Sequence, residues 1–275
     1  MGVTMDVSNK TVVVTGASRG IGAEIAREFA AAGAKVVVSA RSKDSLVSLA
    51  EEIGGIAIPL DATDSEQVRG YIDLVENQVG SIDIFINNAG IEITNLVEDL
   101  TEKEIEETIK VNLITPEVLS SVLVPRMLRR GSGHLVYTSS IAATSGNPGM
   151  AVYCSSKGGL TRFAESLRME LRYTPLNVTI LHLGPVDTAM WGAIDLNPLL
   201  KRGVDRFTKL GVLSVADPVK VAKSALKAVQ KNKREVRLPR RMAINAFLNG
   251  IGTRLFEALL TGIHHREEAG KASTT

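Results

Sequence analysis

The first forty residues contain two short β-branched runs, residues 11–15 and 35–39, separated by a glycine-rich turn and a helical pattern. The turn is Gly16-Ala-Ser-Arg-Gly-Ile-Gly22, and apolar residues at helical spacing follow it as far as Gly33. This order predicts a βαβ unit, in which two parallel strands are joined by a crossover helix. A glycine-rich turn there lets the backbone approach a pyrophosphate at the helix N-terminus, although a tight turn without a ligand is the alternative.

Short apolar strands alternate with helical segments along the rest of the chain. Further strands are predicted over residues 57–60, 82–86, 135–138, 177–181 and 235–238, and helices over 65–79, 101–130, 153–171 and 217–231. Residues 189–215 are predicted to be irregular, as a lid or binding loop. The alternation predicts a single α/β domain with a doubly wound, mostly parallel seven-stranded sheet and helices on both faces.

A tyrosine and a lysine four residues apart follow the predicted strand 135–138. Tyr153 and Lys157 would share one face of a helix, and Ser140 would lie just past the carboxyl end of the strand. A free tyrosine has a pKa of about 10, and a nearby ammonium favours the phenolate. We therefore expect Lys157 to lower the pKa of Tyr153 toward the range that acid–base catalysis uses. The alternative is that the pair shares a helix face by chance.

The charge at the end of the second strand indicates which nicotinamide cofactor would bind. NAD-selective sites usually place Asp or Glu there to bind the ribose 2′-hydroxyl, whereas this chain has Ser39-Ala-Arg41. Arg19 lies within the glycine-rich turn. Two guanidinium groups suit a 2′-phosphate, which predicts NADP(H) rather than NAD, unless Arg41 is merely a solvated loop residue.

Bulk composition excludes several classes of function. The 275 residues carry a net charge of +2, which gives no support for nucleic acid as a partner. The single cysteine, Cys154, permits no intrachain disulfide and fits a reducing compartment. No signal peptide or run of about 18 apolar residues is visible, so we expect a cytoplasmic protein.

Taken together, the motifs resemble those of the short-chain dehydrogenase/reductase family, in its basic form with a Rossmann fold. The resemblance covers roughly residues 8–240 and rests on the order and spacing of six motifs. These are Thr15-Gly-x-x-x-Gly-Ile-Gly22, Asn87-Asn-Ala-Gly90, Asn112, Ser140, Tyr153-x-x-x-Lys157 and Gly184-Pro-Val-x-Thr188. The family often has Pro-Gly where this chain has Leu183-Gly184, which leaves the placement of the nicotinamide less well defined.

The resemblance implies a role for each matching residue. Tyr153 would be the general acid in reduction and the base in oxidation, and Ser140 would hydrogen-bond the substrate carbonyl. Lys157 would hold the nicotinamide ribose, and Asn112 would anchor a water of the proton relay. The expected cofactor contacts are Gly16, Ser18, Arg19, Gly20, Ile21, Gly22, Arg41, Asp61, Ala62, Asn88, Ala89, Gly90, Tyr153, Lys157, Pro185, Val186 and Thr188. No metal is expected.

The expected reaction is hydride transfer between NADP(H) and a carbonyl or secondary alcohol. Apolar residues beside the motifs favour a lipid-like ketone, steroid or 3-oxoacyl substrate, although they could instead pack against each other or a second subunit. The expected substrate pocket consists of Ile91, Ile93, Ile141, Met190 and Trp191. The alternative is a catalytically silent NADP-binding regulatory protein of the same fold. The resemblance also implies a homodimer or homotetramer.

The C-terminal stretch lies beyond the resemblance. We assign residues 1–240 to the NADP-binding domain and 241–275 to an amphipathic helical extension with a polar tail. Six basic residues between Lys231 and Arg241 precede apolar residues at helical spacing. This pattern fits packing on a second subunit or over the substrate entrance, peripheral contact with an anionic membrane, or disorder.

Overall fold

A computed structural model of the chain describes residues 5–196, 198–211 and 213–239. Its centre is a seven-stranded sheet in the order β3-β2-β1-β4-β5-β6-β7, with every neighbouring pair parallel. The sheet is thus entirely parallel, where the sequence predicted a mostly parallel one. The strands are β1 Thr11–Thr15, β2 Lys35–Ser39, β3 Ile56–Ala57, β4 Ile84–Asn87, β5 Gly133–Ser140, β6 Leu176–Leu183 and β7 Glu235–Leu238.

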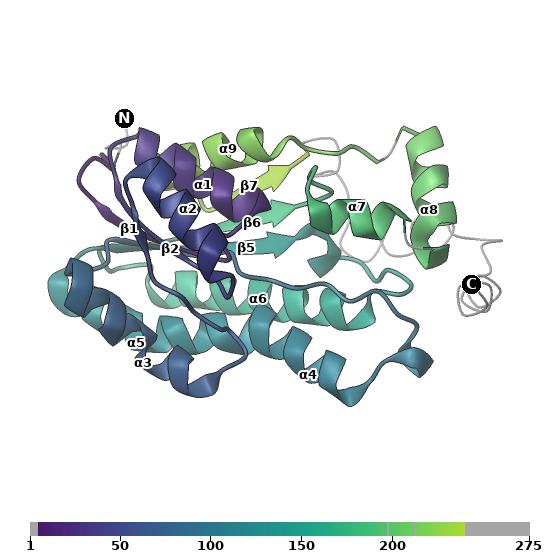
Figure 1. Cartoon of the computed structure of the whole chain (residues 1–275), viewed down its shortest axis with the longest axis horizontal. Coiled ribbons are helices and arrows are strands. Elements are labelled where there is room, and N and C mark those ends of the chain that lie inside the picture. The colour runs from purple at the N-terminus through teal and green to yellow at the C-terminus, as the bar shows by residue number, and fades with distance from the viewer. Residues whose placement is uncertain (1–4, 197, 212, 240–275) are drawn as a thin grey trace.

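Helices cover both faces of the sheet, which confirms the predicted doubly wound α/β fold. In Figure 1, α1, α2 and α9 lie above the sheet and α3, α4, α5 and α6 lie below it. Their bounds are α1 Gly20–Ala31, α2 Lys43–Ile53, α3 Ser65–Val79, α4 Glu102–Ile109, α5 Thr115–Arg130, α6 Ala151–Glu170 and α9 Pro218–Gln230.

The buried strands explain why the sequence shows continuous apolar runs rather than alternation. On β1, Val12 and Val14 pack into the core with α1, whereas Val13 packs into the second core on the other face. All three are fully buried. A parallel sheet covered on both faces has no solvent side, so polar residues are not needed at alternate positions.

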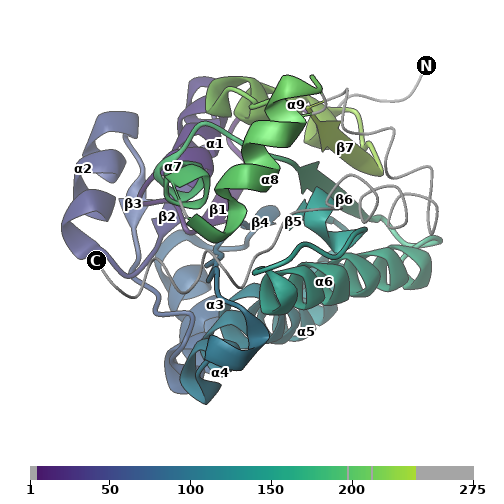
Figure 2. The same ribbon diagram turned by 90° about the vertical axis from the view of Figure 1, so that its right-hand side faces the viewer.

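The parallel arrangement brings the carboxyl ends of the strands to one edge of the sheet. Two helices, α7 Ala189–Leu196 and α8 Pro198–Lys209, lie at this edge. Figure 2 views the molecule from that side, with both helices in front of the strand ends. Ligands of open α/β sheets bind at such an edge, so the fold places the candidate site beneath α7 and α8.

Several predicted boundaries were wrong. Residues 189–215 are not irregular, because α7 and α8 occupy most of them, and the sequence reading missed α2 entirely. The predicted strand 57–60 shifts to Ile56–Ala57, although the backbone N–H groups of Ile58 and Leu60 still donate to β2 and to the residue after it. Ser140 is the last residue of β5 rather than the residue after it.

The predicted helix 101–130 is divided by a π-helical segment over Lys110–Ile114. Pro116 is the second residue after this segment, and a proline cannot donate to the carbonyl one turn earlier, which favours a local change of helical pitch. A capping box begins α4: Thr101 Oγ1 accepts from Glu104 N at 3.3 Å, and Glu104 Oε2 accepts from Thr101 N at 2.8 Å.

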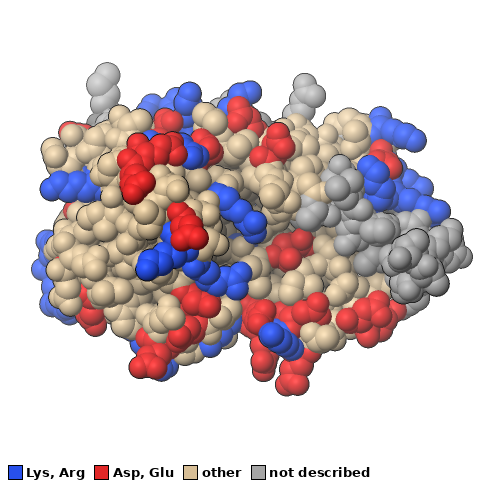
Figure 3. All heavy atoms as spheres, viewed as in Figure 1, with Lys and Arg blue, Asp and Glu red and all other residues tan. Residues whose placement is uncertain are grey.

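The surface carries both signs of charge. On the face shown in Figure 3, acidic side chains gather along the lower edge, where α4 contributes four glutamates, while lysines and arginines are scattered among the described residues. This face therefore shows no extended basic stripe of the kind that nucleic-acid binding uses.

The predicted C-terminal extension, 241–275, lies outside the described residues, so its packing stays a prediction. Within the described part of the chain, no helix combines the length and the apolar character needed to cross a bilayer.

Buried His134 makes folding stability depend on pH. Its side chain is fully buried on β5, and burial, assisted by the charge of Arg168, lowers its pKa to about 3. An unfolded histidine has a pKa of about 6.5, so the unfolded chain binds more protons between these values and stability falls as pH drops. We expect His134 to cost about 2 kcal/mol between about pH 7 and pH 5. Urea unfolding of wild type and His134→Asn at both pH values measures this, and equal losses would contradict it.

Candidate active site

A cavity of about 500 Å³ opens at the carboxyl edge of the sheet. It is lined by every residue predicted to contact the cofactor, from Gly16 in the glycine-rich turn to Thr188 after β6, and by Ser140. Among the predicted site residues, only Asn112 and Ile93 do not line it. The fold thus joins motifs that are more than a hundred residues apart in the chain.

The glycine-rich turn packs so closely on the loop after β4 that two of its residues must be glycine. Gly16 has φ +67°, and a β-carbon there would lie 2.6 Å from Ala89 Cα. A β-carbon on Gly22 would lie 2.3 Å from the carbonyl oxygen of Gly16. Side chains at these positions would push the turn out of the cavity.

Thr15 and Asn88 tie the two loops together. Asn88 Nδ2 donates to the carbonyl oxygens of Thr15 and Gly16 at 3.1 and 3.3 Å. Thr15 Oγ1 accepts from the backbone N–H groups of Asn88 and Ala89, both at 3.1 Å. Asn88 thus joins the loop after β4 to the glycine-rich turn, a role that was not predicted alongside its cofactor contact. Thr15 was missed as a site residue, although it opens the glycine motif.

The first turn of α1 fits a phosphate-bearing cofactor. The helix begins at Gly20, directly after Arg19, and the residues of its first turn line the cavity. Free backbone N–H groups and the positive end of the helix dipole suit a pyrophosphate there. Arg41 lines the same cavity just beyond β2, so both predicted arginines are present at this end of the site.

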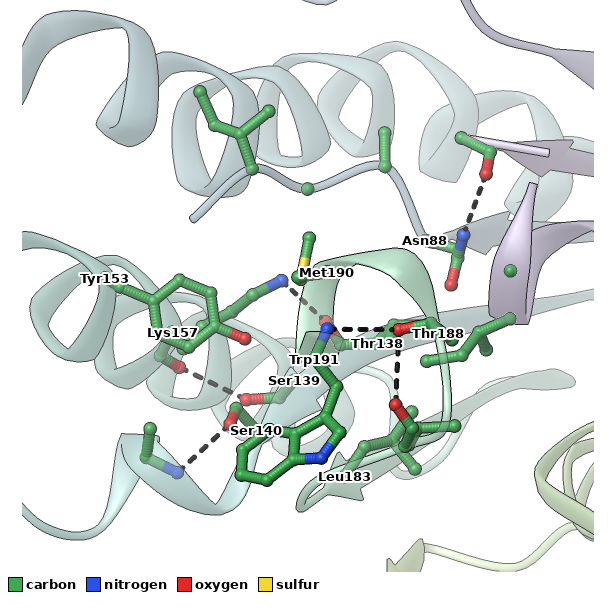
Figure 4. A pocket seen from close by; sticks show the side chains of 18 of the residues that line it. Asn88, Thr138, Ser139, Ser140, Tyr153, Lys157, Leu183, Thr188, Met190 and Trp191 are labelled. Atoms are coloured by element: carbon green, nitrogen blue, oxygen red, sulfur yellow. Dashed lines mark hydrogen bonds between the residues drawn. The ribbon is translucent and has the colours of Figure 1, made fainter. Parts of the chain in front are cut away.

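Tyr153, Ser140 and Lys157 meet at the other end of the cavity (Figure 4). Tyr153 and Lys157 lie on successive turns of α6, with Lys157 Nζ 5.9 Å from the centroid of the tyrosine ring. Lys157 Nζ donates to the carbonyl oxygen of Thr138 at 2.9 Å. Ser140 Oγ accepts from Ala142 N at 3.1 Å, which fixes the direction of the hydroxyl. One phenol, one hydroxyl and one ammonium group thus lie together on the same part of the cavity wall.

Burial dominates the titration of both groups on α6. It raises the pKa of Tyr153 to about 12, while a hydrogen bond with the Ser140 side chain opposes this rise and the charge of Glu92 adds to it. Burial also lowers the pKa of Lys157 to about 8. The expected lowering of the tyrosine pKa by Lys157 is therefore not found, because desolvation of the phenolate outweighs any effect of the ammonium.

Asn112 lies in the π-helical segment and is fully buried, away from the cavity wall. Its Oδ1 accepts from Ile91 N and its Nδ2 donates to Ile91 O, both at 2.8 Å, and Nδ2 also donates to Ser156 Oγ at 3.0 Å. The side chain thus clamps the backbone of a cavity-lining residue. Asparagine is intrinsically unfavourable within a helix, and this clamp gives a reason for its presence here. The predicted contact of Asn112 with a water stays a prediction.

The remaining wall of the cavity is mainly apolar. Ile91, Ile141, Met190 and Trp191 line it, and Figure 4 shows the ring of Trp191 beside Ser140. Helix α8 lies within the stretch 189–215 that was predicted to be an irregular lid or binding loop. That helix contributes Leu200, Gly203, Val204 and Phe207, whose helical spacing was the available signal.

Comparisons with known proteins agree with this geometry. A family model described as short chain dehydrogenase matches residues 10–198. Ketoacyl reductase HetN of Nostoc sp. is 34% identical over 236 residues, covering 84% of this chain and 78% of the relative. The 3-oxoacyl-[acyl-carrier-protein] reductase FabG of Escherichia coli is 33% identical over 192 residues, covering 69% and 79%.

Solved structures give the same result. A metagenomic short-chain oxidoreductase in complex with NADP is 29% identical with a TM-score of 0.69, covering 85% of this chain and 98% of that one. A blue fluorescent protein from a metagenomic library, in complex with NADPH, is 26% identical with a TM-score of 0.77, covering 87% and 100%. The chain therefore belongs to the short-chain dehydrogenase/reductase family of nicotinamide-dependent oxidoreductases.

Proposed function

We propose that the protein is an NADP(H)-dependent oxidoreductase that interconverts a carbonyl group and a secondary alcohol on a small apolar substrate, with 3-oxoacyl compounds as the favoured class. The observation that carries this proposal is that one cavity holds the glycine-rich turn, two arginines, the Ser140–Tyr153–Lys157 group and an apolar wall. A nicotinamide cofactor supplies the hydride in such a reaction.

The protonation of Tyr153 supports a role as general acid. With a pKa of about 12 the phenol keeps its proton at neutral pH and can donate it to a carbonyl oxygen. Ser140 would hydrogen-bond the same oxygen and fix its position beside the phenol. Lys157 would hold the ribose of the cofactor, and its ammonium would stabilise the phenolate that forms once the proton has left.

The choice of NADP(H) rests on Arg19 and Arg41. Both line the cofactor end of the cavity, and no acidic residue stands at the end of β2, where a 2′-hydroxyl would need an acceptor. A guanidinium group can bind a 2′-phosphate through two parallel hydrogen bonds. The two solved relatives in complex with NADP and NADPH support the same choice.

The apolar wall favours a substrate with a hydrocarbon chain. Met190, Trp191 and the α8 residues Leu200, Val204 and Phe207 line the cavity, and Figure 4 shows Trp191 beside Ser140. Relatives named as ketoacyl and 3-oxoacyl reductases suggest the class of carbonyl compound. A 3-oxoacyl group combines a ketone for Tyr153 with a chain for this wall.

A chain-length series tests the proposal. Oxidation of NADPH should accompany reduction of 3-oxoacyl thioesters, and kcat/KM should rise about fourfold per added methylene until the wall is covered, because each buried CH₂ contributes about 0.8 kcal/mol. A short hydrophilic ketone and NADH serve as the controls. No oxidation of NADPH with any carbonyl compound would point to the catalytically silent alternative, and a rate independent of chain length would contradict the apolar substrate.

A further inference from the structure

A second cavity, of about 250 Å³, lies at the end of the sheet opposite the active site. It is formed where α6 ends, β6 begins and the turn between α9 and β7 passes. Figure 1 places the end of α6 far from α7 and α8. The described residues that line it are Arg168, Leu171, Arg172, Thr174, Leu176, Asn177, Val178 and Asn232. None of them is acidic, and the proposed reaction uses none of them.

The arginines at this cavity differ from their neighbours in having no carboxylate partner among the described residues. Arg162, earlier on α6, pairs with Glu165 at 2.7 Å, and Arg237 on β7 pairs with Glu235 at 2.9 Å. By contrast, the structure gives Arg168 and Arg172 no ion pair within its described part. The side chains that form the cavity therefore include no negative charge that would neutralise these two arginines.

Arg168 is held in place by the fold. Its Nη1 donates to the carbonyl oxygen of Val178, and its side chain is half-buried between α6 and β6. Burial and the positive charge of Arg234 both lower the pKa of Arg168. The guanidinium group of Arg234 is thus close enough to destabilise the charged form of Arg168. A bound anion would offset this repulsion.

The rim of the cavity supplies further donors. Arg172 lies over the ring of Tyr173, at 5.4 Å from its centroid, and this contact restrains an otherwise exposed guanidinium group. Asn177 and Asn232 contribute side-chain amides. Asn232 lies just after α9, and its positive φ of +45° is not helical, so the chain changes direction there. The structure gives neither amide a hydrogen-bond partner within the described residues.

We propose that this cavity binds a phosphate group, as free phosphate or as a phosphomonoester, with Arg168 and Arg172 as the charged donors and Asn177 and Asn232 as the neutral ones. Arginine forks match the oxygens of phosphate and can donate two parallel hydrogen bonds to them. Arg234 contributes long-range charge. The cavity is large enough for a phosphate group, and five of the eight residues that line it are charged or polar, which suits a small anion better than an extended apolar ligand.

The test is thermal unfolding of the full chain saturated with NADP⁺, so that the cofactor already occupies the active site. Inorganic phosphate at about ten times its Kd should raise Tm by about 3 °C at constant ionic strength. Glycerol phosphate in a parallel titration distinguishes a phosphomonoester site from one that takes only the free ion, and acetate tests whether any anion suffices.

Variants separate binding from general stabilisation by phosphate. Arg172→Met, an exposed position not expected to affect folding, should remove at least half of the rise in Tm. Arg168→Met/Arg172→Met, which removes both charged donors, should remove nearly all of the rise measured from the variant's own Tm without phosphate. Arg162→Met, on the same helix but paired with Glu165, should leave it unchanged. An equal rise in the double variant and wild type, or an equal response to acetate, would overturn the proposal. Neither outcome bears on the proposed oxidoreductase activity, which the NADPH assay measures separately.

Discussion

Replacing Tyr153 with phenylalanine should lower kcat for carbonyl reduction by 10²- to 10⁴-fold, the range that a general acid typically contributes. The substitution removes the proton donor but keeps the ring on the cavity wall, where Lys157 Nζ lies 5.9 Å from its centroid. Because no cofactor-binding charge is lost, the affinity for NADPH should stay close to that of wild type. Steady-state kinetics and a fluorescence titration of NADPH measure the two quantities.

Lys157→Ala provides the contrast. This change removes an ammonium group that lines the cavity and donates to Thr138 O, so we expect both turnover and NADPH affinity to fall. A loss of less than about tenfold in Tyr153→Phe would show that another group donates the proton. An equal loss of NADPH affinity in both variants would show that Tyr153 acts mainly in binding the cofactor.

The sequence predicted best those parts of the site that are governed by local chemistry. The glycine-rich turn lies between a strand and a helix, as predicted. Its glycines are needed there, because a β-carbon on Gly16 or Gly22 would lie less than 3 Å from neighbouring backbone atoms. The parallel sheet then brought Ser140, at the end of β5, to the same edge as that turn. Residues at strand ends could therefore be assembled from sequence without knowing any distance.

The parts that failed depend on tertiary packing. The helix α2 has only Leu46, Leu49 and Ala50 buried, a stripe too short to stand out among its charged residues. The helices α7 and α8 were predicted to be a loop, although Leu200, Val204 and Phe207 recur at helical spacing along α8 and line the cavity. In both cases the partner surface that stabilises the helix comes from distant residues.

The pKa of Tyr153 shows a different limit of sequence reasoning. The spacing of Tyr153 and Lys157 predicted their neighbouring positions on α6, but not how strongly the surrounding protein desolvates the half-buried phenol. Desolvation depends on every element around the ring, including the loop that carries Glu92. Asn112 is a similar case, because its partner Ile91 lies 21 residues earlier and only the fold brings the two together.

Replacing Arg41 with aspartate should reverse the cofactor preference, lowering kcat/KM for NADPH by about 10²- to 10³-fold while that for NADH is maintained or improved. The change removes charge-assisted hydrogen bonds to a 2′-phosphate, each contributing about 1.5–3 kcal/mol. It also introduces a carboxylate that repels the phosphate and can accept from a 2′-hydroxyl. Arg41 lines the cavity just after β2, at the position where NAD-selective sites carry an acidic residue.

Arg69→Asp is the matched control for this prediction. It changes the charge by the same amount, but Arg69 lies exposed on α3 and does not line the cavity. If long-range charge alone set the preference, both variants would lose NADPH activity to a similar extent. If only Arg41→Asp does so, the selection acts through direct contact, and Arg19 should then account for the NADPH activity that remains. A wild-type protein that already favours NADH over NADPH in kcat/KM would show that neither arginine selects the cofactor.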